Sequence, residues 1–137
     1  MPRLDGVLET ALYVDDLPRA RHFYETILQL KPIFSDRRLC AYDAGARSVL
    51  LLFRRGGSTE TAVLPGGTIP PHDGSGPAHM AFAISADDLE PWEEHLSRQG
   101  IDVEGRTTWP KGSTSIYFRD PDGHLLELAT PGLWPTY

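Results

Sequence analysis

The chain has 137 residues, 40% of them hydrophobic and 23% charged, which suits one globular domain and argues against a disordered protein. Its formal net charge of −6 argues against nucleic acid or an anionic membrane as the partner, because both repel an acidic surface. No apolar run approaches the roughly 20 residues that cross a bilayer. The single cysteine, Cys40, excludes an internal disulfide and fits a reducing cytoplasm, where we expect the protein to be.

The first half of the chain predicts a strand, a helix and three further strands. The first strand alternates as a half-buried strand does, and Asp15 or Asp16 then caps a helix with Pro18 in its first turn. The predicted elements are a strand at 8–14, a helix at 19–30 and strands at 32–35, 39–44 and 48–53. They make a βαβββ module over residues 7–54.

A long segment at 55–77 differs from what precedes it, being rich in Gly, Pro, Ser and Thr. Connections of this length inside a domain are usually binding-site flaps or flexible linkers. The segment carries His72, which we interpret as a loop histidine.

The second half repeats the order of the first. A strand at 78–84 leads to a helix that Asp87 caps and Gly100 ends. Strands follow at 101–107, 113–119 and 125–130, the last two joined by the tight turn Asp120-Pro121-Asp122-Gly123. We expect a second βαβββ module at 78–131, and a single domain over 1–137.

The two modules begin on similar strands, Glu9-Thr10-Ala11-Leu12-Tyr13-Val14 and His79-Met80-Ala81-Phe82-Ala83-Ile84. Each opens on a polar residue that can bind a metal, where a core strand would carry an aliphatic one. Superposing the halves gives four equivalent positions: Glu9, Leu51, His79 and Glu127. Three of these four residues, all but Leu51, can bind a metal.

Strand alternation places these residues on one side of each module. Side chains of a strand alternate between its two faces. Met80, Phe82, Leu126 and Leu128 must pack on a helix, so His79 and Glu127 point the other way, as do Glu9 and Tyr13 in the first module. A carboxylate among apolar strand residues costs several kcal/mol unless a partner or a cation compensates it. A divalent ion fits this need, and a salt link from Glu127 to Arg119 is the alternative.

Other residues on the same face are candidates for contact with a substrate. Tyr13, Ser115 and Tyr117 project there by alternation, either as substrate contacts or only as lining. His124 follows a turn glycine and is expected to be exposed rather than a ligand.

These motifs resemble the vicinal oxygen chelate superfamily, which includes glyoxalase I, fosfomycin-resistance transferases, extradiol dioxygenases and bleomycin-resistance proteins. The resemblance covers about residues 7–131. Its strongest parts are residues 9–17, His22-Phe23-Tyr24, residues 76–82 and residues 117–128, which include Asp120-Pro121-Asp122-Gly123-His124. It implies an α+β fold in which two βαβββ modules form curved mixed sheets that enclose a cup.

The same resemblance implies a ligand set and an assembly. Carried over by position, the metal ligands are Glu9, His79 and Glu127. Glu9 departs from the histidine common at its position, and Leu51 replaces a fourth, carboxylate ligand of glyoxalase I. Trp109 lies in a loop similar to one that covers the mouth of the cup, and joins the substrate-binding candidates. Family members often form homodimers whose metal sites combine residues of both chains.

We therefore expect a divalent-metal enzyme, using Zn, Mn, Fe or Ni as a Lewis acid that chelates oxygens of a small-molecule substrate and stabilises an oxyanion. A lyase, isomerase, transferase or dioxygenase reaction fits such a site. The alternative is a metal-independent small-molecule or antibiotic binding protein of the bleomycin-resistance type, which the aromatic residues around the cup favour.

Overall fold

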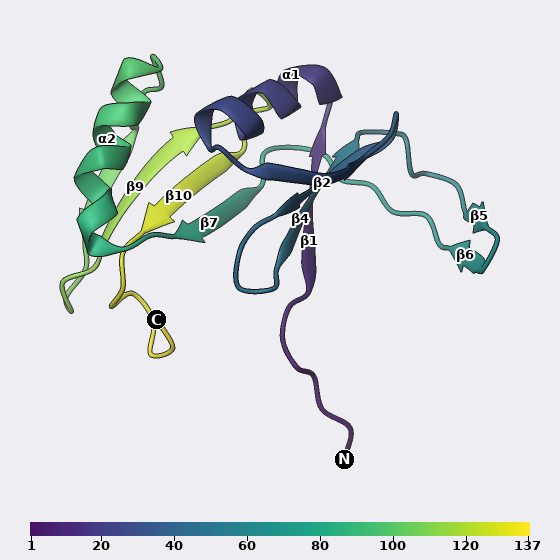
Figure 1. Cartoon of the computed structure of the whole chain (residues 1–137), viewed down its shortest axis with the longest axis horizontal. Helices are drawn as coiled ribbons and strands as arrows, with labels where there is room; N and C mark the ends of the chain where they lie inside the picture. The colour runs from purple at the N-terminus through teal and green to yellow at the C-terminus, as the bar shows by residue number, and fades with distance from the viewer. The chain divides into compact units, whose positions relative to one another are not determined.

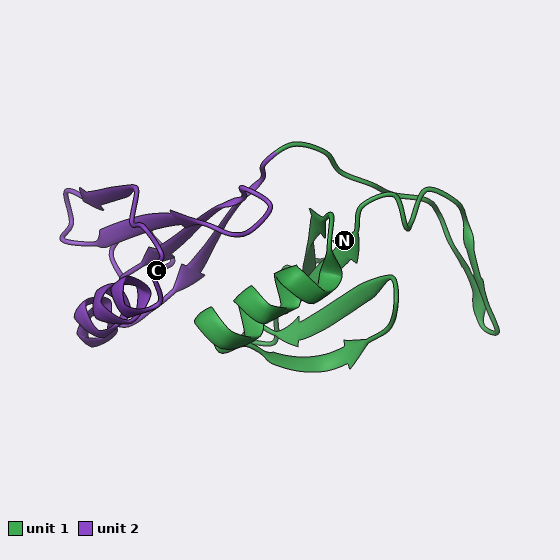
Figure 2. Ribbon diagram, turned by 90° about the horizontal axis from the view of Figure 1, so that it is seen from above, with its two compact units in different colours: residues 1–76 green, residues 77–137 purple.

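The computed structural model describes all 137 residues and divides into two compact units, Met1–Gly76 and Pro77–Tyr137 (Figure 2). Each unit contains one four-stranded sheet and one main helix (Figure 1). The long segment between the modules belongs to the first unit. No helix is both long enough and apolar enough to cross a bilayer.

The first unit follows the predicted order closely. Asp16 caps the helix, accepting a hydrogen bond from the Arg19 amide at 3.1 Å, and Pro18 lies in the first turn. After His22 the helix widens into a π-helical turn, which the spacing of its apolar residues does not reveal. The elements are β1 (Glu9–Val14), α1 (Leu17–His22), the π-helical turn (Phe23–Ile27), β2 (Lys31–Ser35), β3 (Leu39–Asp43) and β4 (Val49–Arg54).

The second unit repeats this order, and the strand that follows its helix, β8, is shorter than its counterpart β2. Its elements are β7 (His79–Ala83), a 3₁₀ turn (Ala86–Asp88), α2 (Leu89–Arg98), β8 (Gly105–Thr108), β9 (Thr114–Arg119) and β10 (Leu125–Ala129). The prediction that Asp87 caps the helix is wrong, because the 3₁₀ turn contains Asp87 and α2 begins after it. β8 covers only the end of the predicted strand.

The two sheets have the same topology. The strand orders are β1-β4-β3-β2 and β7-β10-β9-β8, and in each sheet the first pair is parallel and the others antiparallel. Ala11 pairs with Leu51 in one sheet, and Ala81 pairs with Glu127 in the other. Leu51 and Glu127 therefore occupy equivalent positions, and the predicted βαβββ repeat is confirmed.

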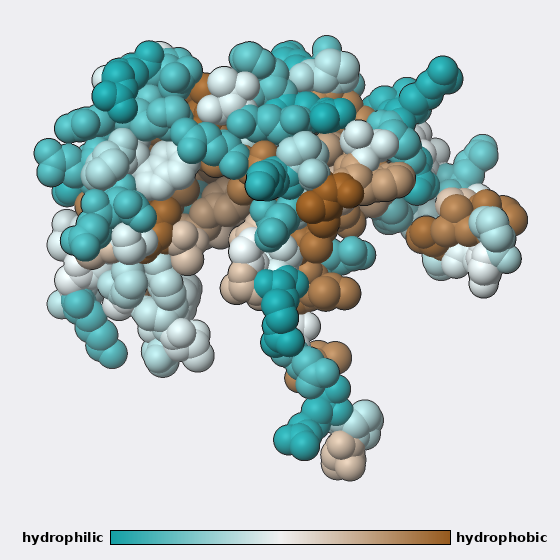
Figure 3. Space-filling view, viewed as in Figure 1, coloured by the Kyte–Doolittle hydropathy of each residue, from teal (hydrophilic) through white to brown (hydrophobic).

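The segment after β4 is more regular than its composition suggests. It contains a small hairpin of β5 (Ala62–Leu64) and β6 (Gly67–Ile69), turning at Pro65 and Gly66. The hairpin exposes the apolar side chains of Val63, Leu64 and Ile69, seen as brown atoms at its end in Figure 3. The expected flap or linker thus contains a hairpin that was not predicted, in which the Pro-Gly turn joins two short paired strands.

The cores confirm the predicted strand faces. In the first unit, α1 packs against β3 and β4, and the buried face of the sheet includes Leu12, Val14, Leu50 and Leu52. In the second unit, the buried face of the sheet consists of alternate residues of β9 and β10, namely Ile116, Phe118, Leu126 and Leu128. Leu96 of α2 is also buried. Residues of opposite parity, including His79 and Glu127, therefore lie on the other face.

Candidate functional site

The second unit brings two of the predicted metal ligands together. His79 is the first residue of β7, and Glu127 is the middle residue of β10. The Nε2 atom of His79 lies 3.2 Å from Oε1 of Glu127. The histidine side chain is half exposed and the carboxylate is buried, so the pair is open on one side only.

The other nitrogen of His79 is held by the backbone. Nδ1 lies 2.8 Å from the carbonyl oxygen of Leu125. A carbonyl only accepts hydrogen bonds, so Nδ1 carries a proton and donates it. In the neutral ring, Nε2 then has an unshared electron pair directed at Glu127.

The second oxygen of Glu127 is held by a buried hydroxyl. Oγ of Ser115 donates to Oε2 of Glu127 at 2.5 Å, and the indole Nε1 of Trp109 donates to the same Oγ at 2.8 Å. Because an indole only donates, the hydroxyl proton is directed to the carboxylate. Two residues predicted to contact substrate thus have hydrogen bonds that orient Glu127, and Ser115 is fully buried.

The result is two hydrogen-bond acceptors that face each other. Oε1 of Glu127 and Nε2 of neutral His79 repel unless a positive charge lies between them, either a proton on the ring or a metal ion. Ligand atoms about 2.0–2.2 Å from one divalent ion lie about 3 Å apart, close to the spacing of this pair. Metal-binding histidines commonly donate their second nitrogen to a carbonyl, and ligating carboxylates are commonly hydrogen-bonded in turn. The donor set therefore fits a divalent ion.

The alternative partner of Glu127 is engaged elsewhere. Nε of Arg119 pairs with Glu104 at 3.2 Å, and Nη1 of Arg119 donates to the Gly123 carbonyl at 3.0 Å. The ring of Tyr117 lies on the same face as Glu127, with its centroid 6.3 Å from that of His79. Tyr117 is half-buried, and its prediction as a substrate contact stands as a prediction.

The third predicted ligand belongs to the first unit. Glu9 is the exposed first residue of β1, on the sheet face opposite α1, and it shares this face with Ala11 and Tyr13. The structure contains no cluster of three His, Cys, Asp or Glu side chains arranged to hold a metal. An ion between His79 and Glu127 would therefore need further ligands.

Tyr13 has a partner that the sequence did not reveal. Its hydroxyl lies 2.7 Å from Nδ1 of His72, and the His72 ring packs edge-on against Phe53 with centroids 4.5 Å apart. Burial, and then the charge of Asp73, raise the pKa of Tyr13. The Pro-rich sequence around His72 contains no periodicity that would place it against β1.

The structure corrects the expectation for His124. This side chain is buried, not exposed, and its Nδ1 accepts a hydrogen bond from the Ala78 amide at 2.8 Å. In the turn before β10, the Asp120 carboxylate accepts a hydrogen bond from the His124 amide at 2.9 Å. The ring is thereby directed inward, although it precedes the strand by one residue.

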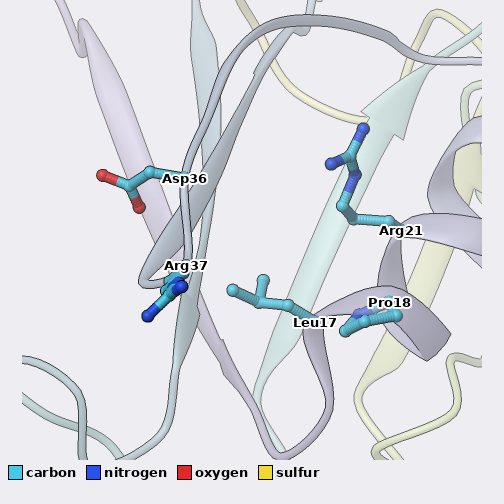
Figure 4. A pocket seen from close by; sticks show the side chains of 5 residues that line it. All are labelled: Leu17, Pro18, Arg21, Asp36 and Arg37. Carbon is cyan, nitrogen blue, oxygen red and sulfur yellow. The ribbon is translucent and has the colours of Figure 1, made fainter.

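A separate surface pocket of about 500 Å³ lies in the first unit, between the start of α1 and the turn after β2. Figure 4 shows its lining side chains, which are Leu17, Pro18, Arg21, Asp36 and Arg37. Arg21 is engaged by Glu25 at 2.7 Å. None of the predicted site residues lines this pocket.

The fold and these motifs agree with the comparison to known families. The model of the Glyoxalase/Bleomycin resistance protein/Dioxygenase superfamily matches residues 6–128. The chain belongs to this superfamily. The predicted glyoxalase-like α+β fold and the resemblance drawn from the sequence are therefore confirmed.

Named relatives of this superfamily member are enzymes. The metallothiol transferase FosB of Staphylococcus saprophyticus is 30% identical over 118 residues, covering 85% of this chain and 71% of that protein. FosB of Bacillus licheniformis is 30% identical over 126 residues, covering 91% and 75% respectively. A crystal structure of lactoylglutathione lyase from Agrobacterium tumefaciens has a TM-score of 0.88 at 32% identity, covering 98% of this chain and 99% of that one.

Proposed function

We propose that this superfamily member is a divalent-metal-dependent enzyme whose ion is held by His79, Glu127 and Glu9. The observation that carries the proposal is the pair of facing acceptors, Nε2 of His79 and Oε1 of Glu127, 3.2 Å apart. Leu125 and Ser115 hold the far side of each group, so both are oriented before an ion arrives.

Each residue has a distinct part in this site. A divalent ion bound there supplies a Lewis acid toward oxygen atoms of a small-molecule substrate. Glu127 provides negative charge in a buried position, and the Trp109–Ser115 hydrogen bonds prevent it from turning away. His79 is half exposed, so substrate can approach on its side of the pair. Tyr13 and Tyr117 remain the proposed substrate contacts.

The relatives support an enzyme rather than a binding protein. Two are named metallothiol transferases and one a lactoylglutathione lyase, so metal and thiol chemistry are the classes to test first. For this chain we infer a transferase or lyase acting on a small molecule.

Glu9 completes the site from the same chain or from a second copy in a homodimer. We propose that it comes from a second copy in a homodimer. Mixing of variant subunits tests this directly. In a shared site, Glu9→Gln chains retain His79 and Glu127, whereas His79→Ala chains retain Glu9. Each variant alone lacks one ligand, but mixed dimers contain one complete site. Recovery of metal binding on mixing supports a shared site, and no recovery assigns Glu9 to its own chain.

The experiment for the metal is calorimetric titration of chelator-treated protein with Zn²⁺, Mn²⁺, Fe²⁺ and Ni²⁺ in turn. We expect about one ion per chain, lost in His79→Ala and Glu127→Gln. Glu104→Gln is the matched control, because Glu104 is an exposed carboxylate of the same unit, paired with Arg119. Absence of stoichiometric binding, or binding that survives both ligand variants, would contradict the proposal. The second result would favour the metal-independent binding protein.

A further inference from the structure

The end of the β7–β10 pair where His79 lies is held by an unusual contact. The amide of Ala78, immediately before His79, donates to a side chain rather than to the backbone. Its acceptor is Nδ1 of His124, 46 residues later, at 2.8 Å. His124 is only 1% exposed, so this imidazole is part of the interior of the unit.

The direction of this bond fixes the chemical state of His124. A backbone amide only donates, so Nδ1 must be the unprotonated nitrogen of the ring. The proton of the neutral ring is then on Nε2. His124 therefore accepts at Nδ1, whereas His79 donates from Nδ1 to a carbonyl. The two histidines hold opposite tautomers at neighbouring positions of the same strand pair.

Three hydrogen bonds connect His124 to the imidazole ring of His79, at the nitrogen opposite the one that faces Glu127. The Ala78 amide donates to His124, the Leu125 amide donates to the Ala78 carbonyl at 2.8 Å, and Nδ1 of His79 donates to the Leu125 carbonyl at 2.8 Å. The second and third bonds need the backbone at Ala78 to stay aligned with Leu125. The bond from Ala78 to His124 supports this alignment just outside the β7–β10 ladder.

We propose that His124 is a positioning residue for His79, and that it sets the affinity of the metal site. This inference rests on the proposed function. His124 touches neither the ion nor the substrate. It holds the backbone from which His79 projects, and thus keeps Nε2 of His79 opposite Glu127. Removing the acceptor lets the start of β7 move, so the two donors lose their spacing.

Two substitutions distinguish the hydrogen-bonding role of His124 from a role in packing alone. In His124→Phe the ring volume remains, but the acceptor at Nδ1 is lost. In His124→Asn the side-chain oxygen stands near the position of Nδ1, so an acceptor for the Ala78 amide is retained. We expect about a tenfold loss of metal affinity in His124→Phe, at the lower end of the range for partners behind metal ligands. His124→Asn should restore most of it.

A control in the same strand pair distinguishes positioning from general stability. The hydroxyl of Tyr137 contacts the carbonyl oxygens of Ile84 at 2.8 Å and Ala129 at 2.7 Å, at the opposite end of β7 and β10. Tyr137→Phe loosens that end and leaves the His79 end intact. It should lower the melting temperature, as His124→Phe does, without changing metal affinity.

The measurements are titration of chelator-treated proteins with Zn²⁺ and Mn²⁺, and nitrogen NMR of the His79 ring without metal. The NMR spectrum should show the proton of His79 on Nδ1 in the wild type and in His124→Asn, and a mixture of tautomers in His124→Phe. Equal affinities and unchanged tautomers in His124→Phe would overturn the inference while leaving the metal site standing. Failure of the wild type to bind either ion would instead overturn the proposed function, and this inference with it.

Discussion

The hydroxyl of Tyr13 and Nδ1 of His72 lie 2.7 Å apart, which joins the end of β1 to a side chain 59 residues later. The ring of Tyr13 also stacks on Phe53 of β4, with centroids 5.9 Å apart. Arg55 fastens the same region, donating to the carbonyls of Tyr13 at 3.1 Å and Gly74 at 3.0 Å. The segment that follows the β5–β6 hairpin is therefore anchored to the sheet face that carries Glu9.

Gly74 makes the first prediction possible, because its backbone lies directly on the Tyr13 ring. A Cβ at this position would stand 2.5 Å from Cδ2 of Tyr13, so Gly74→Ala must displace the ring or the chain. We expect a loss of about 1–3 kcal/mol in the free energy of unfolding, as for other overpacked sites. Urea unfolding measures it. Gly66→Ala is the control, because a Cβ there meets nothing within 4 Å. Equal stability of the two variants would show that Tyr13 is not held in this position.

The alternation of side chains along the strands predicted on which face of the sheet the candidate site residues lie. His79 and Glu127 are polar, whereas the residues that alternate with them in the same strands are apolar. This pattern alone placed both residues on one face of the sheet. The family resemblance implied that these two residues share one site, and the structure pairs β7 with β10. The hairpin in the long segment was missed, although Pro65 and Gly66, a turn-forming pair, stand between its two short strands.

The contacts of loop residues could not be read in the same way. His124 and His72 each bind a group far away in the chain, and no local pattern shows which amide or hydroxyl needs an acceptor. Ser115 illustrates a related limit. Its parity correctly placed it on the face of Glu127, but only the structure shows that its hydroxyl is used by Trp109 and Glu127.

Ser115 leads to the second prediction. Ser115→Ala leaves Oε2 of Glu127 without its hydroxyl donor, which costs about 1–3 kcal/mol for a buried acceptor. We also expect metal affinity to fall roughly 10–100-fold, as when other partners of ligating residues are removed. Ser113→Ala is the matched control, because Ser113 is equally buried and donates to the Thr130 carbonyl at 2.6 Å. Both variants should lose stability, measured by urea unfolding, and only Ser115→Ala should lose metal. A parallel loss of metal in Ser113→Ala would mean that affinity simply follows stability.

Glu127→Gln should abolish metal binding without lowering the stability of the metal-free protein. With a neutral His79 ring, Nε2 of His79 and Oε1 of Glu127 in the metal-free wild type are two acceptors that face each other. In the variant, the side-chain amide that replaces the carboxylate can donate to Nε2 of His79 while its oxygen still accepts from Ser115. We therefore expect metal-free Glu127→Gln to melt at the same temperature as the metal-free wild type, or higher. Only the wild type should gain stability from metal, about 2.7 kcal/mol at a concentration 100 times its Kd. A Glu127→Gln protein that is strongly destabilised without metal would show that the carboxylate is satisfied by a proton instead.

The last prediction concerns Tyr42, whose fully buried hydroxyl donates to Glu25 at 2.9 Å. Burial, reinforced by its neighbours Cys40 and Glu25, raises the pKa of Tyr42 well above its ordinary value. The folded protein thus holds this proton more tightly than the unfolded chain, where tyrosine titrates near pH 10. Its contribution to stability is complete below about pH 10 and is lost as the pH rises further.

We therefore expect urea midpoints to fall steeply above about pH 10, and the fall to be shallower in Tyr42→Phe, which has no proton to lose. The slope should not vanish, because the pKa values of Tyr13 and Tyr137 are also raised, mainly by burial. Tyr117→Phe is the control, because Tyr117 is a half-buried tyrosine on the open sheet face, and its midpoints should decline as in the wild type. An unchanged alkaline slope in Tyr42→Phe would mean that other groups control the loss of structure at high pH.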